Sequence, residues 1–470
     1  MDTIVANCPV DSNRFDLVVQ PFLRDPGLPF AQVLSARDIE RAFAEQGALF
    51  GQEDIYSTQL VLWAFLAQVL RDGKGSACAS AVADIATYMQ QIGGAVPAGD
   101  TGDYCRARAK LDLPALRSLV NQAAERLDRK APADWLWHGL RAKLVDGFTF
   151  TMPDTPANQK AFPQSKTQKP GVGLPIARVC AVLSLATAAI HDLAVGPYQG
   201  KPTGENALLR VILDCLGAGE VVVFDRYFCS FMMLALLKLR GVEACTRLHQ
   251  RRHSDYRRGR RLGKHDHLVT WTRPQRPAWM SEELYATIPQ TMTLRELEFN
   301  VLVPGRRTET ITIITTLTDP AVYPKEDIAD LFGCRWNVEL DIRSIKQTLG
   351  LDHVRCKSPE MVRRELWVTM LAYNLVRGLI VMAAATHGKR PRQLGFTLAC
   401  QTVLSSWMLL STRACRDARG LWRSTLERIA ANEVANRPGR IEPRVLKRRR
   451  HRYPLMIRPR QELRQNLCPT

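Results

Sequence analysis

Four charged side chains in the second half of the chain have a spacing that could support chemistry. Arg335, Glu339, Arg343 and Lys346 follow one another at intervals of four, four and three residues. On one regular α-helix, with 3.6 residues per turn, this spacing places all four on the same face. A carboxylate flanked by three cations could hold a metal ion and bind phosphates at the same time. Similar ladders also occur on ordinary exposed helices, so the spacing alone leaves both interpretations open.

Two aspartates favour the first interpretation, because each lies at the end of an apolar, strand-like run. Asp146 lies in the segment 142–152, and Asp225 ends the apolar run that begins at Val221. If these two strands are neighbours in one sheet, their carboxylates converge, and Glu339 can complete the cluster. Three carboxylates suit hard cations such as Mg²⁺ or Mn²⁺, and two such ions support an in-line phosphoryl displacement. We therefore predict a catalytic site that binds two metal ions.

The elements that must position these residues follow from the pattern of apolar residues along the chain. Residues 33–130 have a helical pattern, and the basic segment 100–110 is typical of a helix-turn-helix DNA reader, although a plain helical domain fits as well. From residue 141 onwards a strand pattern begins, and the order of three strands, one helix and a fourth strand is the opening of a ribonuclease-H-like domain. Strands are expected at 142–152, 175–185, 188–195, 221–225, 243–248, 267–272, 294–303 and 308–317, with helices at 203–216, at 230–239 and from 359 onwards.

The net charge of the chain indicates a polyanion as its partner. The 470 residues carry a formal charge of +19, and the sequence pI is about 9.7. Nucleic acid is the first candidate partner, and an anionic membrane surface is the weaker one. Two clusters contribute much of this charge: Arg251, Arg252, Arg257, Arg258, Arg260 and Arg261 in a central tract, and Arg444, Lys447, Arg448, Arg449, Arg450 and Arg452 near the C-terminus.

Other features indicate a cytoplasmic protein that does not span a membrane. The first residues lack the basic and apolar regions of a signal peptide. The longest apolar stretch, 366–385, contains Asn374 and Arg377 and therefore predicts a buried helix. The 12 cysteines are scattered, with no C-x-x-C pair, so we expect reduced thiols and no structural zinc.

The sequence resembles the bacterial insertion-sequence transposases of the Asp-Asp-Glu class, within the insertion-sequence-four family. The signature of that family, Tyr-x2-Arg-x3-Glu-x6-Lys, is present as Phe332, Arg335, Glu339 and Lys346, with Phe in place of Tyr. Further matching tracts begin at Asp146-Gly and Met152-Pro-Asp, at Asp225-Arg-Tyr, at Trp271-Thr-Arg and at Arg355-Cys-Lys, so that the resemblance runs from about residue 55 to about residue 460.

The resemblance implies a role for each matching residue. Asp146, Asp225 and Glu339 become the metal ligands for Mg²⁺ or Mn²⁺, and Arg335 and Lys346 become contacts to DNA phosphates near the transposon end. A tyrosine hydroxyl at position 332 would be expected to bind a phosphate as well, so Phe332 leaves the level of activity open. The other candidate DNA-binding residues are Trp336 and Arg343 in the signature segment, and Arg251, Arg252, Arg257 and Arg258 in the basic tract.

The resemblance also implies cut-and-paste transposition through hairpin-ended intermediates, in which an extruded base usually stacks on an aromatic ring. Trp271, Trp279 and Trp336 are the available indoles, and the sequence does not choose among them. The partners would be the terminal repeats and the target DNA, and the active form would be a homodimer on paired ends, in the nucleoid of a bacterium. Two alternatives stay open: a catalytically impaired, domesticated DNA-binding relative, and a nuclease of the same fold that does not join strands.

The expected fold is α/β, with a ribonuclease-H-like core that a β-rich insertion interrupts. Its expected parts are a helical N-terminal DNA-binding domain at 1–140, the first part of the core at 141–250, a basic loop with the β-rich insertion at 251–318, the second part of the core with the Glu helix at 319–400, and a helical, basic C-terminal region at 401–470.

Overall fold

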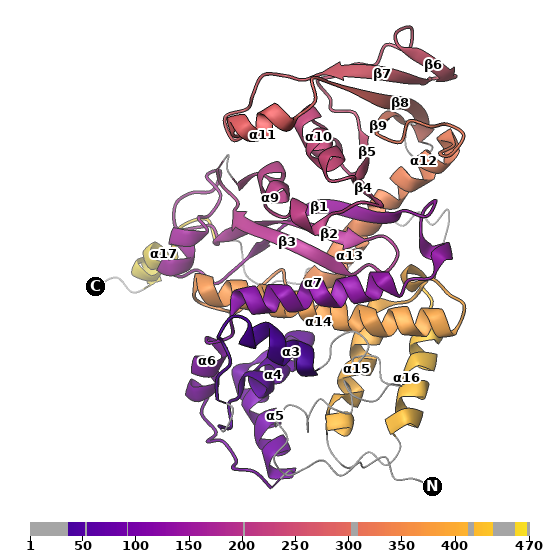
Figure 1. The fold of residues 1–470 in the computed structure, drawn as a ribbon. Coiled ribbons are helices and arrows are strands. Elements are labelled where there is room, and N and C mark those ends of the chain that lie inside the picture. Colours follow the sequence, from indigo (N-terminus) through magenta and orange to yellow (C-terminus); the bar gives the residue numbers. More distant parts are fainter. Residues whose placement is uncertain are drawn as a thin grey trace.

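The computed structural model shows a mixed α/β protein built on one large sheet with helices on both of its faces (Figure 1). The structure describes residues 36–51, 54–91, 93–200, 203–301, 309–411, 418–435 and 456–467. Within these ranges the sheet has nine strands in the order β3-β2-β1-β4-β5-β9-β8-β7-β6. The expected α/β class is confirmed.

The first five strands lie close to the residue ranges, and in the order along the chain, that the sequence predicts. Strands β1 (Arg141–Thr151), β2 (Ile176–Ser184) and β3 (Ile190–Pro197) form an antiparallel meander. Strand β4 (Glu220–Phe224) pairs in parallel with β1, and β5 (Glu243–Arg247) pairs in parallel with β4. All five residues of β4 are buried, which explains its continuous apolar run.

The β-rich segment extends this same sheet rather than forming a sheet of its own. Strand β9 (Glu309–Thr315) is antiparallel to β5, and β8 (Thr291–Val301) and β7 (Asp266–Thr272) follow it outward. The edge strand β6 (Arg260–Gly263) lies in the basic tract that the sequence analysis treats as a loop. Its four residues carry no period-2 apolar pattern, so its pairing with β7 could not be predicted locally.

Two separate hydrophobic clusters cover the two faces of the sheet. Helices α9 (Glu205–Val211) and α10 (Phe231–Leu239) pack on one face, where Leu209 lies in the same cluster as Val145. The other face carries α7 (Leu113–Arg129) and α14 (Pro359–Thr386), and Leu144 belongs to that cluster. Successive residues of β1 therefore serve opposite faces, as a pleated strand requires.

The long helix α14 separates the sheet from a second, helical layer (Figure 1). Among the described helices it is the one long and apolar enough to cross a membrane by length and composition, yet 89% of its apolar window is buried inside the protein. This burial agrees with the core helix that the sequence predicts. The helical layer contains α3 (Ala36–Ala44), α4 (Thr58–Leu70), α5 (Cys78–Gln91), α6 (Gly102–Arg108), α15 (Phe396–Ser411) and α16 (Ala418–Ala431).

The remaining helices are short and lie outside these two layers or connect them. They are α8 (Pro156–Ala161), α11 (Glu282–Thr287), α12 (Lys325–Gly333), α13 (Asn337–Arg343) and α17 (Arg460–Leu467). All nine cysteines in the described part of the chain are free thiols. Helix α6 does not present all its basic residues to solvent, because the Arg108 guanidinium is buried over the Phe65 ring at 4.7 Å and donates to Gln68 Oε1 at 3.2 Å.

Candidate active site

The parallel pairing of β1 and β4 places the two predicted aspartates on adjacent positions. Val145 is the register partner of Phe224, so Asp146 and Asp225 are the next residues on the two strands. The pleat directs both toward the face that α7 and α14 cover. Strand β4 ends at Phe224, whereas β1 continues to Thr151. Asp146 therefore lies at the point where the pairing of β1 with β4 ends.

The signature segment is not the single regular α-helix that the spacing predicts. A 3₁₀ turn (Cys334–Trp336) follows α12 and leads into α13, and a π-helical turn (Ser344–Thr348) follows α13. Arg335 and Glu339 share a face as predicted, because their side chains form an i,i+4 pair at 3.5 Å, whereas the π turn takes Lys346 out of the regular α-helical register. The Lys346 ammonium lies 2.8 Å from Asp352 Oδ1 rather than beside Glu339. Such π turns occur often at functional sites.

The guanidinium of Arg335 lies near two of the predicted carboxylates, those of Asp146 and Glu339. Its Nη1 atom lies 3.9 Å from Asp146 Oδ2, and its Nη2 atom lies 3.5 Å from Glu339 Oε1. The Asp146 side chain is 22% exposed and that of Glu339 is 44% exposed, so the cluster opens to solvent on the α13 side. Arg335 is thus a cation placed between carboxylates from β1 and α13.

The donor set fits a divalent ion in charge and in ligand type. In the described ranges no three Asp, Glu, His or Cys side chains are gathered closely enough to hold an ion as they stand. The guanidinium of Arg335 lies where an ion shared by Asp146 and Glu339 would be bound. An ion held by both carboxylates would therefore have to displace the Arg335 guanidinium.

Burial raises the pKa of the Asp146 carboxyl to about 6. The neighbouring carboxylates of Glu205 and Glu339 contribute to this rise, after burial as its main cause. The Gly147 N–H, which donates to Asp146 Oδ1 at 2.8 Å, and the Arg335 guanidinium both oppose this shift. A carboxyl whose ionised form is disfavoured by burial gains from a bound cation, because the cation favours the ionised form.

This raised pKa predicts how stability depends on pH in the metal-free protein. Between the ordinary value of 3.8 and about 6, the folded protein binds more protons at Asp146 than the unfolded chain does. Asp146 therefore lowers the free energy of unfolding as pH rises through this window, and its penalty is complete above about pH 6. We expect Asp146→Asn to stabilise the protein at pH 7.5 and to have a smaller stabilising effect at pH 4.5. Urea unfolding in EDTA measures both differences, and equal differences would contradict the prediction.

One more carboxylate, which was not predicted from the sequence, lies near Asp146. Glu205, the first residue of α9, lies against Gly147, directly after Asp146. Burial raises the pKa of the Glu205 carboxyl, and the Asp225 carboxylate raises it further while Arg178 opposes the shift. The sequence signal that could have indicated this contact is the glycine in the interior of an otherwise apolar strand.

A buried ion cluster fixes the position of α13 and therefore of Glu339. Asp341 is 2% exposed; its Oδ1 atom accepts from Arg377 Nη2 of α14 at 2.9 Å, and its Oδ2 atom accepts from Arg392 Nη1 at 2.8 Å. Arg392 also donates to the carbonyls of Ser184 and Leu185 at the end of β2. The helix with the predicted catalytic glutamate is thereby tied to both α14 and the sheet.

The aromatic residues near the signature differ in exposure. Trp336 is 62% exposed, with the Arg335 guanidinium 4.6 Å from its ring centroid. Trp279 is 44% exposed and lies beneath Arg210 at 4.0 Å, whereas Trp271 is buried and lies beneath Arg252 at 3.8 Å. Phe332 is buried in the core cluster. The ring of a tyrosine at this position would therefore be packed in the core and not exposed at the surface.

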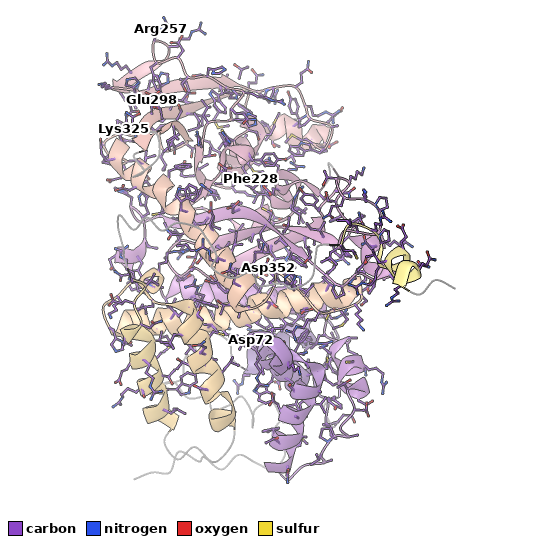
Figure 2. The ribbon with its side chains drawn as sticks, turned by 180° about the vertical axis from the view of Figure 1, so that it is seen from behind. Asp72, Phe228, Arg257, Glu298, Lys325 and Asp352 are labelled. Carbon is purple, nitrogen blue, oxygen red and sulfur yellow. The ribbon has the colours of Figure 1, made fainter. Side chains whose placement is uncertain are left out.

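The central basic tract is exposed, but it lies away from the carboxylates. Arg251, Arg252, Arg257 and Arg258 are all exposed, and both Arg257 and Arg258 form ion pairs with Asp255. The tract leads into β6, the edge strand of the sheet beyond β9, β8 and β7. Figure 2 shows Arg257 at one end of the molecule and Asp352 near its middle. The basic C-terminal tract at 444–452 lies outside the described residues.

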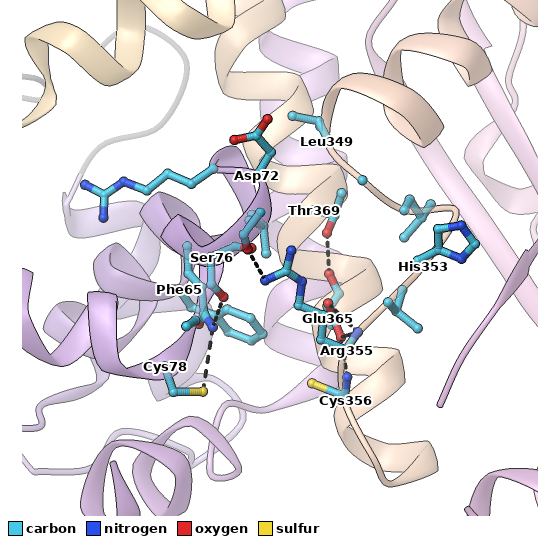
Figure 3. Close-up of a pocket in the computed structure, with 18 of the residues that line it drawn as sticks. Phe65, Asp72, Ser76, Cys78, Leu349, His353, Arg355, Cys356, Glu365 and Thr369 are labelled. Atoms are coloured by element: carbon cyan, nitrogen blue, oxygen red, sulfur yellow. Dashed lines mark hydrogen bonds between the residues drawn. The ribbon is translucent and has the colours of Figure 1, made fainter. Parts of the chain in front are cut away.

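A cavity of about 480 Å³ lies where the helical layer meets the segment after the signature (Figure 3). Arg355 crosses this junction and donates to the Gly73 carbonyl at 2.8 Å. The Glu365 carboxylate accepts the backbone N–H groups of Arg355 and Cys356. These contacts connect α14 and the loop before it to the turn after α4. The cavity therefore lies at a contact between two parts of the fold, and its lining does not include Asp146, Asp225 or Glu339.

A comparison with protein-family models shows the class to which the chain belongs. The model of the transposase DDE domain family matches residues 137–375, about half of the chain. The chain belongs to this family of DDE transposases.

Comparison with known proteins gives a relative that matches over nearly the full length. The chain is 28% identical over 437 residues to the transposase InsG for insertion sequence element IS4 of Escherichia coli K12, covering 92% of this chain and 94% of that protein. This similarity places the chain in the insertion-sequence-four family, as the sequence analysis predicts. A shorter match, 31% identical over 70 residues, is to the transposase for insertion sequence element IS421 of Escherichia coli and covers 15% of this chain and 19% of that one.

One solved structure also matches along most of the chain. It is the piggyBac transposase synaptic complex with hairpin DNA, with a TM-score of 0.41 and 11% sequence identity, over 90% of this chain and 86% of that one.

Proposed function

We propose that this protein is a metal-dependent DNA transposase that moves an insertion sequence by a cut-and-paste route. The observation that supports the proposal is the placement of Asp146 and Asp225 at adjacent positions of two parallel strands, with the Arg335 guanidinium between the carboxylates of Asp146 and Glu339. The first five strands would be a ribonuclease-H-like core. The intact set of three carboxylates favours an active enzyme over an impaired DNA-binding relative.

The roles of the residues follow from their positions. Asp146, Asp225 and Glu339 would hold two Mg²⁺ ions, which when bound would activate water or a 3′-hydroxyl and stabilise the leaving oxygen. Arg335, Arg343 and Lys346 would bind phosphates of the transposon end, since phosphate contacts position DNA without reading its sequence. The exposed Trp336 ring, next to Arg335, suits stacking against a base of the distorted end.

The remaining parts of the chain would supply the DNA substrate and the assembly. The helical region up to residue 140 would recognise the terminal repeats, and the basic C-terminal region would support a homodimer on paired ends. Both ends must be cut together before they are joined to target DNA, which requires at least two active sites. The excess of positive charge suits action on the bacterial nucleoid.

A cleavage assay with the purified protein tests the proposed function. The substrate is a labelled duplex with the terminal repeat that flanks the coding sequence, incubated with Mg²⁺, with Mn²⁺ or with EDTA. A transposase yields a nick at the end, then a hairpin, and then joining of the end to a target plasmid, all dependent on the metal ion. Metal-dependent nicking without hairpins or joining would indicate a plain nuclease, and binding without cleavage would indicate an impaired relative.

The basic tract predicts a strong dependence of DNA affinity on salt. Each phosphate that a cation neutralises contributes about 0.9 to the slope of log K against log salt concentration. Replacing Arg251, Arg252, Arg257 and Arg258 with glutamine should therefore weaken binding and reduce this slope by up to about 3.6. Fluorescence anisotropy of a labelled duplex, at salt concentrations from about 50 to about 200 mM, measures both the affinity and its salt slope.

The control for this prediction is a duplex of the same length with a scrambled sequence. Phosphate contacts carry no sequence information, so the loss of affinity should be about equal for the repeat and for the scrambled duplex. A loss confined to the terminal repeat would show instead that the tract reads bases.

A further inference from the structure

The cavity between the helical layer and the segment after the signature has a buried cation in its wall. Arg108 of α6 lines this cavity, and only 9% of its surface is exposed. In the described part of the chain Arg108 forms no ion pair, and its buried Nε atom has no hydrogen-bond partner. An arginine keeps its charge inside a protein, and a buried charge without a counter-ion is costly. A bound anion would remove this cost.

The groups that surround the Arg108 guanidinium do not neutralise it. Its Cζ atom lies 4.7 Å from the centroid of the Phe65 ring and 5.6 Å from that of the Tyr104 ring. Burial raises the pKa of the Tyr104 hydroxyl and that of the Cys356 thiol, which lines the same cavity. Both groups are therefore neutral at pH 7, and neither supplies the missing negative charge.

Gln68 fixes the position of Arg108 and has no capacity left for a ligand. Its Oε1 atom accepts from Arg108 Nη1 at 3.2 Å and from the Tyr104 hydroxyl at 2.9 Å. Its Nε2 atom donates to the Ser76 carbonyl at 2.8 Å and lies 3.7 Å from Cys78 Sγ. An amide side chain offers two donors and two lone pairs, so all of them are used. The amide thus holds the guanidinium in place without balancing its charge.

A second arginine lines the cavity at its exposed side. Arg355 is exposed, and its Nη1 atom donates to the Gly73 carbonyl at 2.8 Å (Figure 3). Within the ranges that the structure describes, Arg355 forms no ion pair through its guanidinium. The lining also contains two carboxylates, but Asp72 is exposed and Glu365 accepts the backbone N–H of Arg355 at 3.1 Å. Two arginines of one cavity, Arg108 and Arg355, therefore lack a carboxylate partner.

We propose that this cavity binds a small phosphorylated ligand, whose phosphate group is held by Arg108 and Arg355. The planar fork of a guanidinium matches the oxygens of a phosphate, and a phosphate with two negative charges would balance two arginines. The volume of about 480 Å³ lies in the range of small-molecule sites. Phe65, Leu351 and Val354 add apolar surface to the lining, which suits a ligand with a ring as well as a phosphate.

The ligand would connect two parts of the fold. Arg108 belongs to α6 of the helical layer, and Arg355 belongs to the loop before α14. A ligand that contacts both should stabilise the folded protein, because it binds the folded state and not the unfolded chain. The inference does not rest on the proposed function, since the lining contains none of the predicted metal ligands.

Calorimetric titration of the full-length protein in EDTA, at constant ionic strength, tests the proposal. The probes are inorganic phosphate, adenosine monophosphate and adenosine. Arg108→Gln should weaken binding of the phosphate-bearing probes by at least about tenfold, because a charged hydrogen-bond partner is lost. The matched control is Arg106→Gln, since Arg106 is exposed on the same helix and pairs with Asp103; it should bind within about twofold of the parent.

The three probes distinguish the two sources of a phosphate group. Adenosine monophosphate bound at least about tenfold more tightly than inorganic phosphate would assign the site to a mononucleotide, and equal affinities would assign it to free phosphate. Adenosine bound as tightly as its monophosphate would overturn the proposal, because the phosphate would then contribute nothing. The absence of binding by the parent protein, or equal binding by Arg108→Gln and the parent, would overturn it as well.

Ala77→Phe gives a second test that leaves Arg108 and its partners in place. Ala77 is exposed and lines the cavity, so a phenyl ring there would obstruct the entrance. We expect the variant to unfold near the parent temperature without ligand, and its unfolding temperature to rise less than that of the parent when the tighter-binding probe is added. An equal rise in both proteins would show that the ligand binds elsewhere and would overturn the proposal, even if Arg108→Gln does not fold.

Discussion

Replacing Asp146 with asparagine is expected to reduce cleavage of the transposon end by at least about 1000-fold, because metal ions supply several kcal/mol of transition-state stabilisation and each 1.36 kcal/mol corresponds to a factor of ten. Asp225→Asn and Glu339→Gln should have effects of the same order. Asparagine keeps the size of the side chain but removes the charge that holds the ion. Binding of the end in EDTA should stay within about twofold of the parent value, since phosphate contacts supply most of the affinity.

Single-turnover cleavage with Mg²⁺ and a mobility-shift assay in EDTA measure the two quantities on the same duplex. Asp214→Asn is the matched control, because the Asp214 side chain is 91% exposed and pairs with Arg240 away from the carboxylate cluster. That control should cleave at the parent rate. Cleavage by Asp146→Asn at more than a tenth of the parent rate would contradict the role assigned to Asp146.

The second large effect, on the free energy of unfolding, is expected from the buried ion cluster that Asp341 of α13 forms with Arg377 and Arg392. Asp341→Ala leaves the guanidinium groups of Arg377 and Arg392 without their shared carboxylate, and Arg377 is almost fully buried. Removing one partner of a buried pair costs about 3–5 kcal/mol, because the remaining charge is neither hydrated nor paired. We therefore expect a loss of this size in the free energy of unfolding, measured by urea denaturation.

An exposed ion pair provides the control for this loss. Glu125 and Arg129 form an i,i+4 pair on α7 with side chains that are 53% and 68% exposed. Glu125→Ala should change the free energy of unfolding by less than about 1 kcal/mol, as is typical of surface pairs. If Asp341→Ala costs no more than Glu125→Ala, the cluster does not anchor α13.

Much of the fold could be predicted because local patterns determine it. The apolar run 221–224 gives a strand buried on both faces, and Ser358 with Pro359 marks the start of α14, where the Ser358 hydroxyl accepts from the Met361 N–H. The neighbouring positions of Asp146 and Asp225 follow once the two strands are parallel. Each of these features depends on residues close together in the sequence.

The features that escaped prediction depend on contacts between distant segments. Glu205 reaches Gly147 only because α9 packs across β2 and β3, and no spacing in the sequence encodes that contact. Strand β9 joins the sheet through β5, more than 60 residues earlier in the chain, as the pairing of Thr246 with Ile314 shows. The π turn that redirects Lys346 likewise has no signature in residue type.

The continuous sheet also sets the distance between the carboxylate cluster and the basic edge strand β6. Six inter-strand steps separate β1 from β6 in the order β1-β4-β5-β9-β8-β7-β6, and steps of about 4.8 Å give a span of about 30 Å. B-DNA rises by about 3.4 Å per base pair, so this span equals about nine base pairs, close to one helical turn. A duplex bound at the carboxylate cluster and running along the sheet would therefore reach the arginines of β6 about nine base pairs from its end, a little less than one helical turn.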